Sequence, residues 1–203
     1  LSLHDALPIS RQLCDRYQVH LICDEIAVGC GRTGTFFAHE QTGIRPDFLC
    51  LSKGISGGYL PLSIVLTTDD IYAAFYDDAT ARGFLHSHSY TGNALACRAA
   101  LATLDIFRAD DVLAANRQRS EKIIAALAPL ADHPQVRHLR QRGMIAAFDV
   151  LTDDPHFSRR FYRAALAREA LLRPIGTTVY LMPPYIVSDE EIAHLGQAVA
   201  GDR

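Results

Sequence analysis

Two charged side chains of opposite sign follow short apolar runs of this sequence. Asp24 ends the run in "VHLICDE" (19–25), and Lys53 follows "DFLCLS" (47–52). In an open α/β sheet, ligands bind beyond the carboxyl ends of the strands. A carboxylate and an amine at neighbouring strand ends form either an ion pair, which is the common arrangement for buried charges, or contacts to a bound group. On these two residues alone, the ion pair is the simpler interpretation.

Glycines follow both charged residues. "DEIAVGCGRTG" (24–34) contains three glycines and one cation, Arg32, and "KGISGG" (53–58) contains three more glycines. A glycine costs about 0.5–1 kcal/mol in regular structure, so it is favoured where the backbone turns tightly or lies against a ligand. The repeated pattern of a functional side chain and permissive backbone therefore favours a binding site. Arg32 either lies near the entrance of that site or braces the glycine turn.

Short apolar runs with β-branched residues predict the strands that position these side chains. The three predicted strands are 19–25, 47–52 and 62–68. Because loops and helices join them, we expect a largely parallel sheet. Asp69 or Asp70 is expected to cap a helix that runs to about Phe75.

Two amphipathic helices are predicted next. The first covers 91–107 and has Asn93 as its N-cap. Its expected apolar stripe is Leu95, Ala99, Ala102 and Ile106. The second helix lies within 110–131. Its expected inward-facing side chains are Leu113, Ile123 and Leu127.

A separate small α+β unit is predicted in the C-terminal part of the chain. Its elements alternate strand and helix: 143–151, 156–172, 178–185 and 188–199. The last helix opens with a capping box, in which Ser188 is the N-cap and Glu191 reaches back to it. We place the domain boundary near Ala109.

Composition limits the class of protein. The chain has 203 residues, of which 49% are hydrophobic and 21% charged, and its net charge is −3; these values are typical of globular proteins. That charge gives no reason to expect nucleic acid or a membrane as partner, and no apolar run approaches the roughly 18 residues of a membrane helix. The five cysteines are scattered and never spaced CxxC. We therefore expect reduced thiols, packed as small apolar residues in a cytoplasmic protein.

The first ten residues, "LSLHDALPIS", show no clear relation to the segment that follows. A helical pattern begins only near Arg11, and no secretory signal is visible. Residues 1–10 are therefore interpreted either as a non-native leader or as an ordinary loop.

Three motifs occur in order along the chain: "DEIAVGCGRTG" (24–34), "LSKGISGG" (51–58) and "HSHSYTGNALACRAALATL" (86–104). Together they resemble the class III family of pyridoxal-phosphate-dependent aminotransferases, from about residue 12 to the C-terminus. The resemblance implies an α/β protein of fold type I. Residues 11–109 would form the C-terminal part of the large cofactor-binding domain, with a mostly parallel sheet, and residues 110–203 a small α+β domain.

The resemblance assigns roles around the cofactor pyridoxal 5'-phosphate. Lys53 falls on the lysine that forms a Schiff base with the cofactor and then carries a proton between substrate and cofactor. Asp24 falls on the acid that pairs with the protonated pyridine nitrogen, which keeps the ring an electron sink. Ile26, on the same strand face as Asp24, would pack against the ring as well as fill the core.

Ser89 matches the hydroxyl residue that binds the cofactor phosphate from a neighbouring subunit, so the resemblance implies a homodimer with its active site at the subunit interface. The usual residue is Thr, and the preceding Ser87 and His88 also depart from the family pattern. A serine hydroxyl still donates to phosphate, and the amides of the following helix would add to the site. Ser87 is assigned to the substrate side. His86 and His88 lack a matching third ligand, so no metal site is expected.

Arg173 matches the family arginine that receives a substrate carboxylate, which a guanidinium binds through two hydrogen bonds. The alternative is a surface arginine at a helix C-terminus, where the helix dipole favours a cation. Tyr180 and Tyr185 would either line the cleft or pack in the core or an interface.

Two segments, "GFLHSHSYTGNALAC" (83–97) and "RPIGTTVYLMPPYI" (173–186), are most similar to the family members of biotin biosynthesis. These transfer an amino group from S-adenosylmethionine to 8-amino-7-oxononanoate and form 7,8-diaminononanoate. The alternatives are a class III enzyme acting on an ω-amino acid or 4-aminobutyrate, and an inactive truncated fragment. Complete members carry a long N-terminal portion with a glycine–serine phosphate loop and aromatic cofactor contacts, which this sequence does not contain. Little or no turnover is therefore expected of the 203 residues alone.

Overall fold

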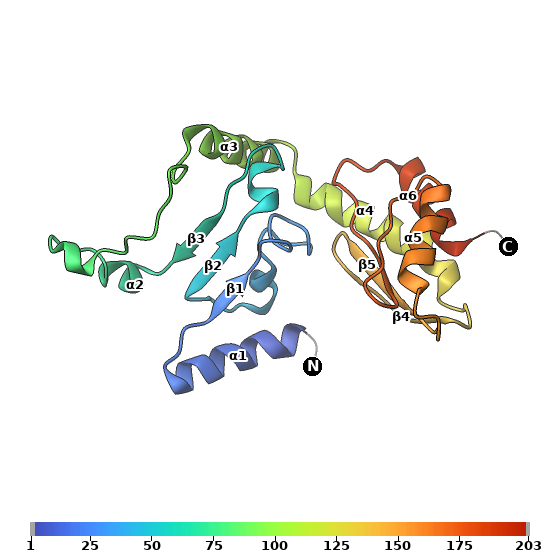
Figure 1. Cartoon of the computed structure of the whole chain (residues 1–203), viewed down its shortest axis with the longest axis horizontal. Coiled ribbons are helices and arrows are strands. Elements are labelled where there is room, and N and C mark those ends of the chain that lie inside the picture. The colour runs from blue at the N-terminus through green and yellow to red at the C-terminus, as the bar shows by residue number, and fades with distance from the viewer. Residues whose placement is uncertain (1–2, 202–203) are drawn as a thin grey trace. The chain divides into compact units, whose positions relative to one another are not determined.

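The computed structural model describes residues 3–201, with side chains from residue 6 onward. The chain divides into two compact units, Leu1–Asp111 and Val112–Arg203. Each unit has its own three-stranded sheet, and the elements follow one another along the chain as Figure 1 shows. No helix of the described part is long and apolar enough to cross a membrane.

The sheet of the first unit has the order β1-β2-β3. Its strands are β1 (Ile22–Asp24), β2 (Phe48–Leu51) and β3 (Ile64–Thr67). β1 and β2 are parallel, but β2 and β3 are antiparallel, so the predicted mostly parallel sheet is wrong for the second pair. A parallel pair needs a crossover, usually an α-helix. Between β2 and β3 the chain forms only the short 3-10 helix η2 (Lys53–Ser56).

The first helix, α1 (Leu3–Tyr17), begins well before Arg11, where the sequence predicted its start. Pro8 lies inside α1 and removes one backbone hydrogen bond without ending the helix. α1 packs against the 3-10 helix η1 (Ala38–Thr42). The alternative of an ordinary loop is wrong for the described residues 3–10, which are helical, whereas a non-native leader stays a prediction.

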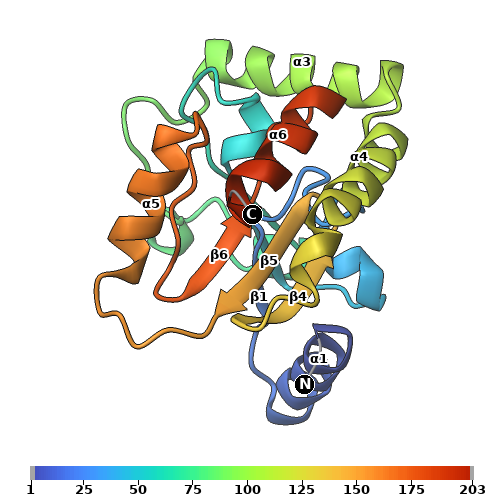
Figure 2. The same cartoon turned by 90° about the vertical axis from the view of Figure 1, so that its right-hand side faces the viewer.

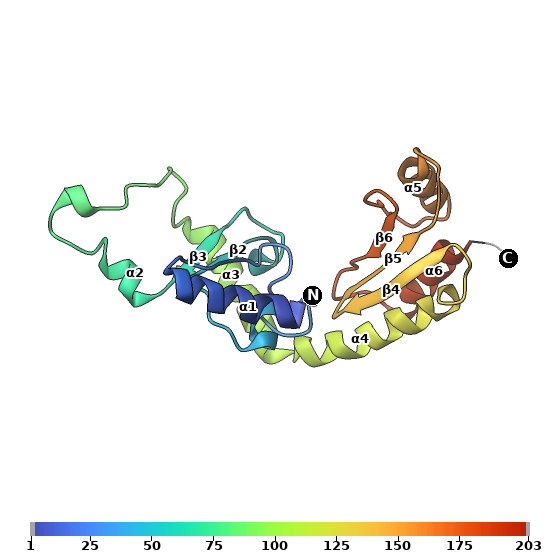
Figure 3. The same ribbon diagram turned by 90° about the horizontal axis from the view of Figure 1, so that it is seen from below.

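The helix α2 (Asp69–Ala73) is capped by Thr68, whose hydroxyl accepts from the backbone N–H of Ile71, so the predicted caps Asp69 and Asp70 are wrong. Threonine is among the preferred N-cap residues, because its hydroxyl accepts from a backbone N–H of the first turn. The segment 74–93, with the 3-10 helix η3 (Thr80–Arg82), then extends away from the sheet of its unit (Figures 1 and 3).

The long helix α3 (Ala94–Ala109) has the predicted cap: Asn93 Oδ1 accepts from the backbone N–H of Leu95 at 2.9 Å. Its predicted stripe is wrong, because Leu95 is 72% and Ile106 53% exposed, whereas Ala96 and Ala100 are buried. α3 packs against η2. This approach is so close that a Cβ on Gly57 would lie 3.2 Å from Thr103 Oγ1, and only small side chains fit there.

The second unit has an antiparallel sheet of order β4-β5-β6, with the helices on one side of it (Figure 2). Its strands are β4 (Val136–Arg142), β5 (Ile145–Val150) and β6 (Thr178–Leu181). Its helices are α4 (Val112–Leu127), η4 (Ala128–Leu130), α5 (Phe157–Ala167) and α6 (Asp189–Ala200). β4 was not predicted, because three arginines and a histidine leave "VRHLRQR" without an apolar pattern.

One large hydrophobic cluster holds the second unit together. Ile123 and Leu127 of α4 are buried in it, as predicted, whereas Leu113 is only half-buried. The predicted capping box of α6 is confirmed, since Ser188 Oγ accepts from the Glu191 N–H and Glu191 accepts from the Ser188 N–H.

The chain between α5 and β6 is extended rather than helical. α5 ends at Ala167, before the predicted end at residue 172, and Glu169 has a left-handed φ of 58°. Ala170, Leu172 and Pro174 are buried, and the residues between them are exposed. This alternation is that of an extended segment.

Candidate functional site

Asp24 and Lys53 lie at the same edge of the first sheet. β1 and β2 are parallel, and Asp24, the last residue of β1, is opposite Cys50 of β2. β2 ends at Leu51, and Lys53 follows two residues later. Both side chains are exposed. The prediction that they end neighbouring strands is therefore confirmed.

The backbone of Lys53 directs its side chain away from the core. Leu49 and Leu51 are buried on one face of β2, and strict alternation would place Lys53 on that face. Lys53 instead has a left-handed φ of 46° and is exposed. A non-glycine residue in this region costs about 1–3 kcal/mol, and such residues cluster at functional sites.

Asp24 and Lys53 are not salt-bridged to each other. Asp24 Oδ1 accepts a hydrogen bond from the backbone N–H of Ile26 at 3.0 Å, which fixes the carboxylate at the strand end. Among residues 3–201, no ion pair joins Asp24 to Lys53. Ile26 is half-buried beside them. An exposed carboxylate and an exposed amine at one sheet edge suit a group bound between them.

The glycines after Lys53 serve the packing of the chain itself. A Cβ on Gly54 would lie 3.0 Å from Cys30 Cβ, which is tighter than ordinary contact. Gly57 ends η2 in a left-handed conformation with φ of 62°, and Gly58 has φ of 78°. Tight turns and close approach within the first unit therefore account for these glycines without a ligand.

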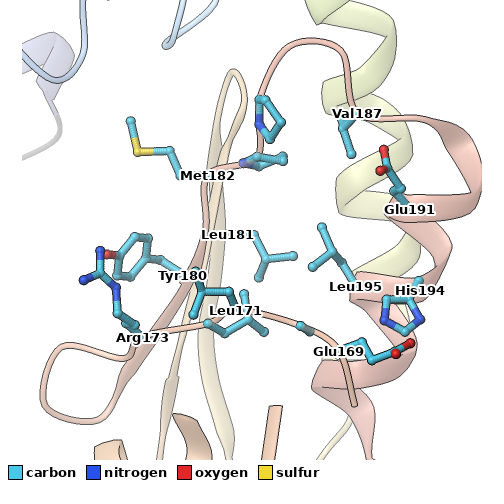
Figure 4. Close-up of a pocket in the computed structure, with 14 residues that line it drawn as sticks. Glu169, Leu171, Arg173, Tyr180, Leu181, Met182, Val187, Glu191, His194 and Leu195 are labelled. Atoms are coloured by element: carbon cyan, nitrogen blue, oxygen red, sulfur yellow. The ribbon is translucent and has the colours of Figure 1, made fainter. Parts of the chain in front are cut away.

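Arg173 lines a pocket of the second unit with a volume of about 650 Å³. Arg173 is exposed and lies on the extended segment after α5, so the alternative of an arginine at a helix C-terminus is wrong. In Figure 4, Arg173 and Tyr180 lie on one side of this pocket and Glu191 and His194 on the other. Tyr185, by contrast, packs against the core of its unit.

Ser87 and Ser89 lie exposed on the segment that leaves the sheet of the first unit. A local turn sets the backbone here: the N–H of His88 donates to Thr91 Oγ1 at 3.0 Å, and His88 Nδ1 accepts from the N–H of Tyr90 at 3.1 Å. Asn93 Oδ1 accepts hydrogen bonds from the backbone N–H groups of Leu95 and Ala96 at the start of α3. The amides of this helix start were expected to add to the phosphate site. In the described part of the chain, no three His, Cys, Asp or Glu side chains form a metal site.

The cysteines divide by burial. Cys23 and Cys30 are buried, as expected of small apolar residues, and burial raises the pKa of the Cys30 thiol to about 11. Cys14 and Cys50 are half-buried, and Cys97 is exposed on α3, which contradicts the expectation of a core position.

The burial of Glu25, the carboxylate next to Asp24, could not be predicted from the sequence. Glu25 is 4% exposed and accepts hydrogen bonds from the segment around His39. Its partners lie far along the chain, so a local pattern cannot identify it.

The model of the aminotransferase class-III family matches residues 4–200, and the chain belongs to this family. The resemblance seen in the sequence is thereby confirmed. An adenosylmethionine-8-amino-7-oxononanoate aminotransferase of Helicobacter pylori is 51% identical in an alignment 195 positions long, which covers 93% of this chain and 44% of the relative. The enzyme of that name from Nitratidesulfovibrio vulgaris is 43% identical in an alignment 201 positions long, which covers 94% of this chain and 37% of the relative. The chain thus spans less than half the length of these relatives.

Solved structures give the same fold. An amine transaminase from an uncultivated Pseudomonas species, solved in the PLP-bound form, has a TM-score of 0.88 and 32% identity over 97% of this chain and 47% of that chain. The adenosylmethionine-8-amino-7-oxononanoate aminotransferase of Methanocaldococcus jannaschii has a TM-score of 0.84 and 33% identity over 93% of this chain and 47% of that chain. The fold is that of a fold-type I transaminase, as predicted.

Proposed function

We propose that this chain is the C-terminal part of an aminotransferase of biotin biosynthesis. The enzyme would transfer an amino group from S-adenosylmethionine to 8-amino-7-oxononanoate and form 7,8-diaminononanoate. The observation that carries the proposal is the exposed pair of Asp24 and Lys53 at one sheet edge of a class III chain. The names of the relatives at 51% and 43% identity support the choice of substrates.

The residues at the sheet edge fit pyridoxal 5'-phosphate as cofactor. When bound, the cofactor supplies an electron-accepting ring. The carboxylate of Asp24 would hold the proton on the pyridine nitrogen, and Ile26 would pack against one face of the ring. Lys53 Nζ would hold the cofactor covalently and, once the amine of the substrate displaces it, move a proton from the substrate Cα.

The remaining roles need a second subunit and the second unit of the chain. Ser89 would donate to the cofactor phosphate of a neighbouring subunit in a homodimer, and its exposure on a projecting segment supports this. Ser87 would lie on the substrate side. Arg173 would bind a substrate carboxylate, which its exposed position in the wall of the pocket supports.

The choice of amino donor tests the proposed reaction. The protein to assay is the full-length parent, by which we mean this chain together with the N-terminal half found in its relatives. We expect transamination of 8-amino-7-oxononanoate with S-adenosylmethionine, and little or no turnover by residues 1–203 alone. Activity with alanine or 4-aminobutyrate but none with S-adenosylmethionine would instead identify a different class III transaminase. The similarity to an amine transaminase structure is the reason to test this alternative.

A further inference from the structure

Glu25 points away from Asp24, although the two residues are adjacent. Cys23, Asp24 and Glu25 are buried, exposed and buried in turn, because successive side chains of an extended strand point to opposite faces. Glu25 is 4% exposed. A carboxylate this deeply buried is costly unless donors satisfy it.

Two backbone N–H groups and a histidine ring nitrogen of one distant segment contact the Glu25 carboxylate. Oε2 accepts from the backbone N–H of Ala38 at 2.7 Å, and Oε1 accepts from the backbone N–H of His39 at 2.8 Å. The ring nitrogen Nδ1 of His39 lies 2.8 Å from the same Oε1. These contacts tie the end of β1 to the start of η1.

The backbone of Glu25 adds two further ties. Its N–H donates to the carbonyl oxygen of Cys50 at 3.0 Å, which continues the pairing with β2. Its carbonyl oxygen accepts from the N–H of Gly29 at 2.9 Å, and a Cβ on Gly29 would lie 2.9 Å from that oxygen. The backbone of Glu25 therefore links the turn at Gly29 to the end of β1 and to β2.

Cys30, in the glycine-containing segment 24–34, packs against Gly54, the residue after Lys53. Cys30 is 3% exposed and packs so closely on Gly54 that a Cβ there would lie 3.0 Å from Cys30 Cβ. Gly54 follows Lys53, whose φ of 46° directs its side chain away from the core. The position of Cys30 thus limits where the backbone of Lys53 lies.

We propose that Glu25 is a positioning residue for both Asp24 and Lys53. Its buried contacts keep Asp24 on the open side of the sheet, and through Cys30 and Gly54 they fix the left-handed backbone of Lys53. Glu25 itself takes no part in the proton transfers. The inference rests on the roles proposed above for Asp24 and Lys53.

The test is Glu25→Gln in the full-length parent, which keeps the shape but replaces one accepting oxygen with an NH₂ group. We expect kcat to fall about 10- to 100-fold, as for a small misplacement of reacting groups, while KM changes less than about threefold. The near-visible absorbance band of bound pyridoxal phosphate should shift or weaken, and the far-ultraviolet circular dichroism should not change. The matched control is Glu40→Gln, an exposed carboxylate of the same turn that accepts from the Phe37 N–H at 3.1 Å and should leave kcat unchanged.

An unchanged kcat and absorbance band in Glu25→Gln would overturn the inference. If that variant does not fold, Gly54→Ala tests the same coupling: kcat should fall through the contact with Cys30, and Cys30→Gly in the double variant should restore it. Glycine suits position 30, where φ is 54°; absence of rescue would contradict the coupling. Lys53→Ala separates the two proposals. If the absorbance band persists in Lys53→Ala, the proposed function is contradicted. If the band is lost in Lys53→Ala but Glu25→Gln is unaffected, only the role of Glu25 is contradicted.

Discussion

Asp24 and Glu25 carry the same charged group in opposite environments. Asp24 is exposed at the sheet edge, where it is free to meet a bound cation or ring nitrogen, and Glu25 is buried against Ala38 and His39. Lys53 has a left-handed φ of 46° and is exposed, although strict strand alternation would place it on the buried face. The proposed site thus combines one exposed carboxylate, one exposed amine and the buried contacts behind them.

A third carboxylate, Asp149, gives a prediction about pH. Hydrogen bonds from Thr178 Oγ1 at 2.7 Å, then from Arg140 and His138, lower the pKa of Asp149 to about 2. Since the folded pKa lies below the unfolded value of about 3.9, Asp149 stabilises the chain above pH 4 and loses this effect as the pH falls towards 2. Urea denaturation should give a free-energy difference between the chain and Asp149→Asn that is constant at neutral pH and declines between about pH 4 and 2.

The control for that titration is Asp132→Asn, an exposed aspartate of the same unit, which should leave the free energy of unfolding unchanged. A difference between the chain and Asp149→Asn that persists undiminished at pH 2 would contradict the assignment.

Local patterns predict strand ends but not buried polar contacts. The apolar runs before Asp24 and Lys53 are sufficient to place both at strand ends, because a short apolar run with β-branched residues is a local signal of a buried strand. The buried carboxylate of Glu25 meets its donors at residues 38 and 39, and Gly54, which follows Lys53, packs against Cys30. Such contacts exist only once the chain has folded.

Elements with a clear apolar pattern or a polar cap were predictable, and elements placed by tertiary contacts were not. The caps at Asn93 and Ser188 form as predicted, since they are local hydrogen bonds. The strand β4 escaped prediction because its sequence is mostly charged. The apolar stripe of α3 was wrong because the residues of α3 that pack in the first unit include Ala100, Leu104 and Phe107, whereas Leu95 and Ile106 are exposed.

The contacts of Asp47 attach α1 to the first sheet and should contribute to stability. Asp47 accepts from the Leu21 N–H and from Arg11 Nη1, both at 2.7 Å, and these contacts lower the pKa of Asp47. Asp47→Asn should lower the free energy of unfolding by about 1–3 kcal/mol, because bonds to a charged, partly buried group are lost. Asp15→Asn is the matched control: Asp15 bonds the same Arg11 at 2.7 Å but is 66% exposed, so its loss should cost less than about 1 kcal/mol.

Chemical denaturation of the three proteins measures this difference. Equal stability of Asp47→Asn and Asp15→Asn would show that the partly buried contact does not fix α1 to the sheet.

The two units of the chain differ in how many large apolar side chains they expose to solvent. Among the described residues, the second unit has one large core cluster, and the first has two small ones. The first unit also exposes large apolar side chains, among them Tyr59 at 87%, Leu85 at 80% and Tyr90 at 75%. Exposed apolar surface of this kind marks an interaction site. We expect the N-terminal half and a second subunit to cover it in the full-length parent.

The site of cofactor attachment can be measured directly, because this chain has two lysines, Lys53 and Lys122. Lys122 is an exposed residue of α4 that pairs with Asp189 at 2.7 Å, so it is a matched control. Borohydride reduction of the full-length parent loaded with pyridoxal phosphate makes the bond between lysine and cofactor permanent, and peptide mass spectrometry then locates it. We expect the phosphopyridoxyl group on Lys53 and none on Lys122, with labelling abolished in Lys53→Ala and unchanged in Lys122→Ala. Labelling elsewhere, with Lys53 unmodified, would contradict the proposed site.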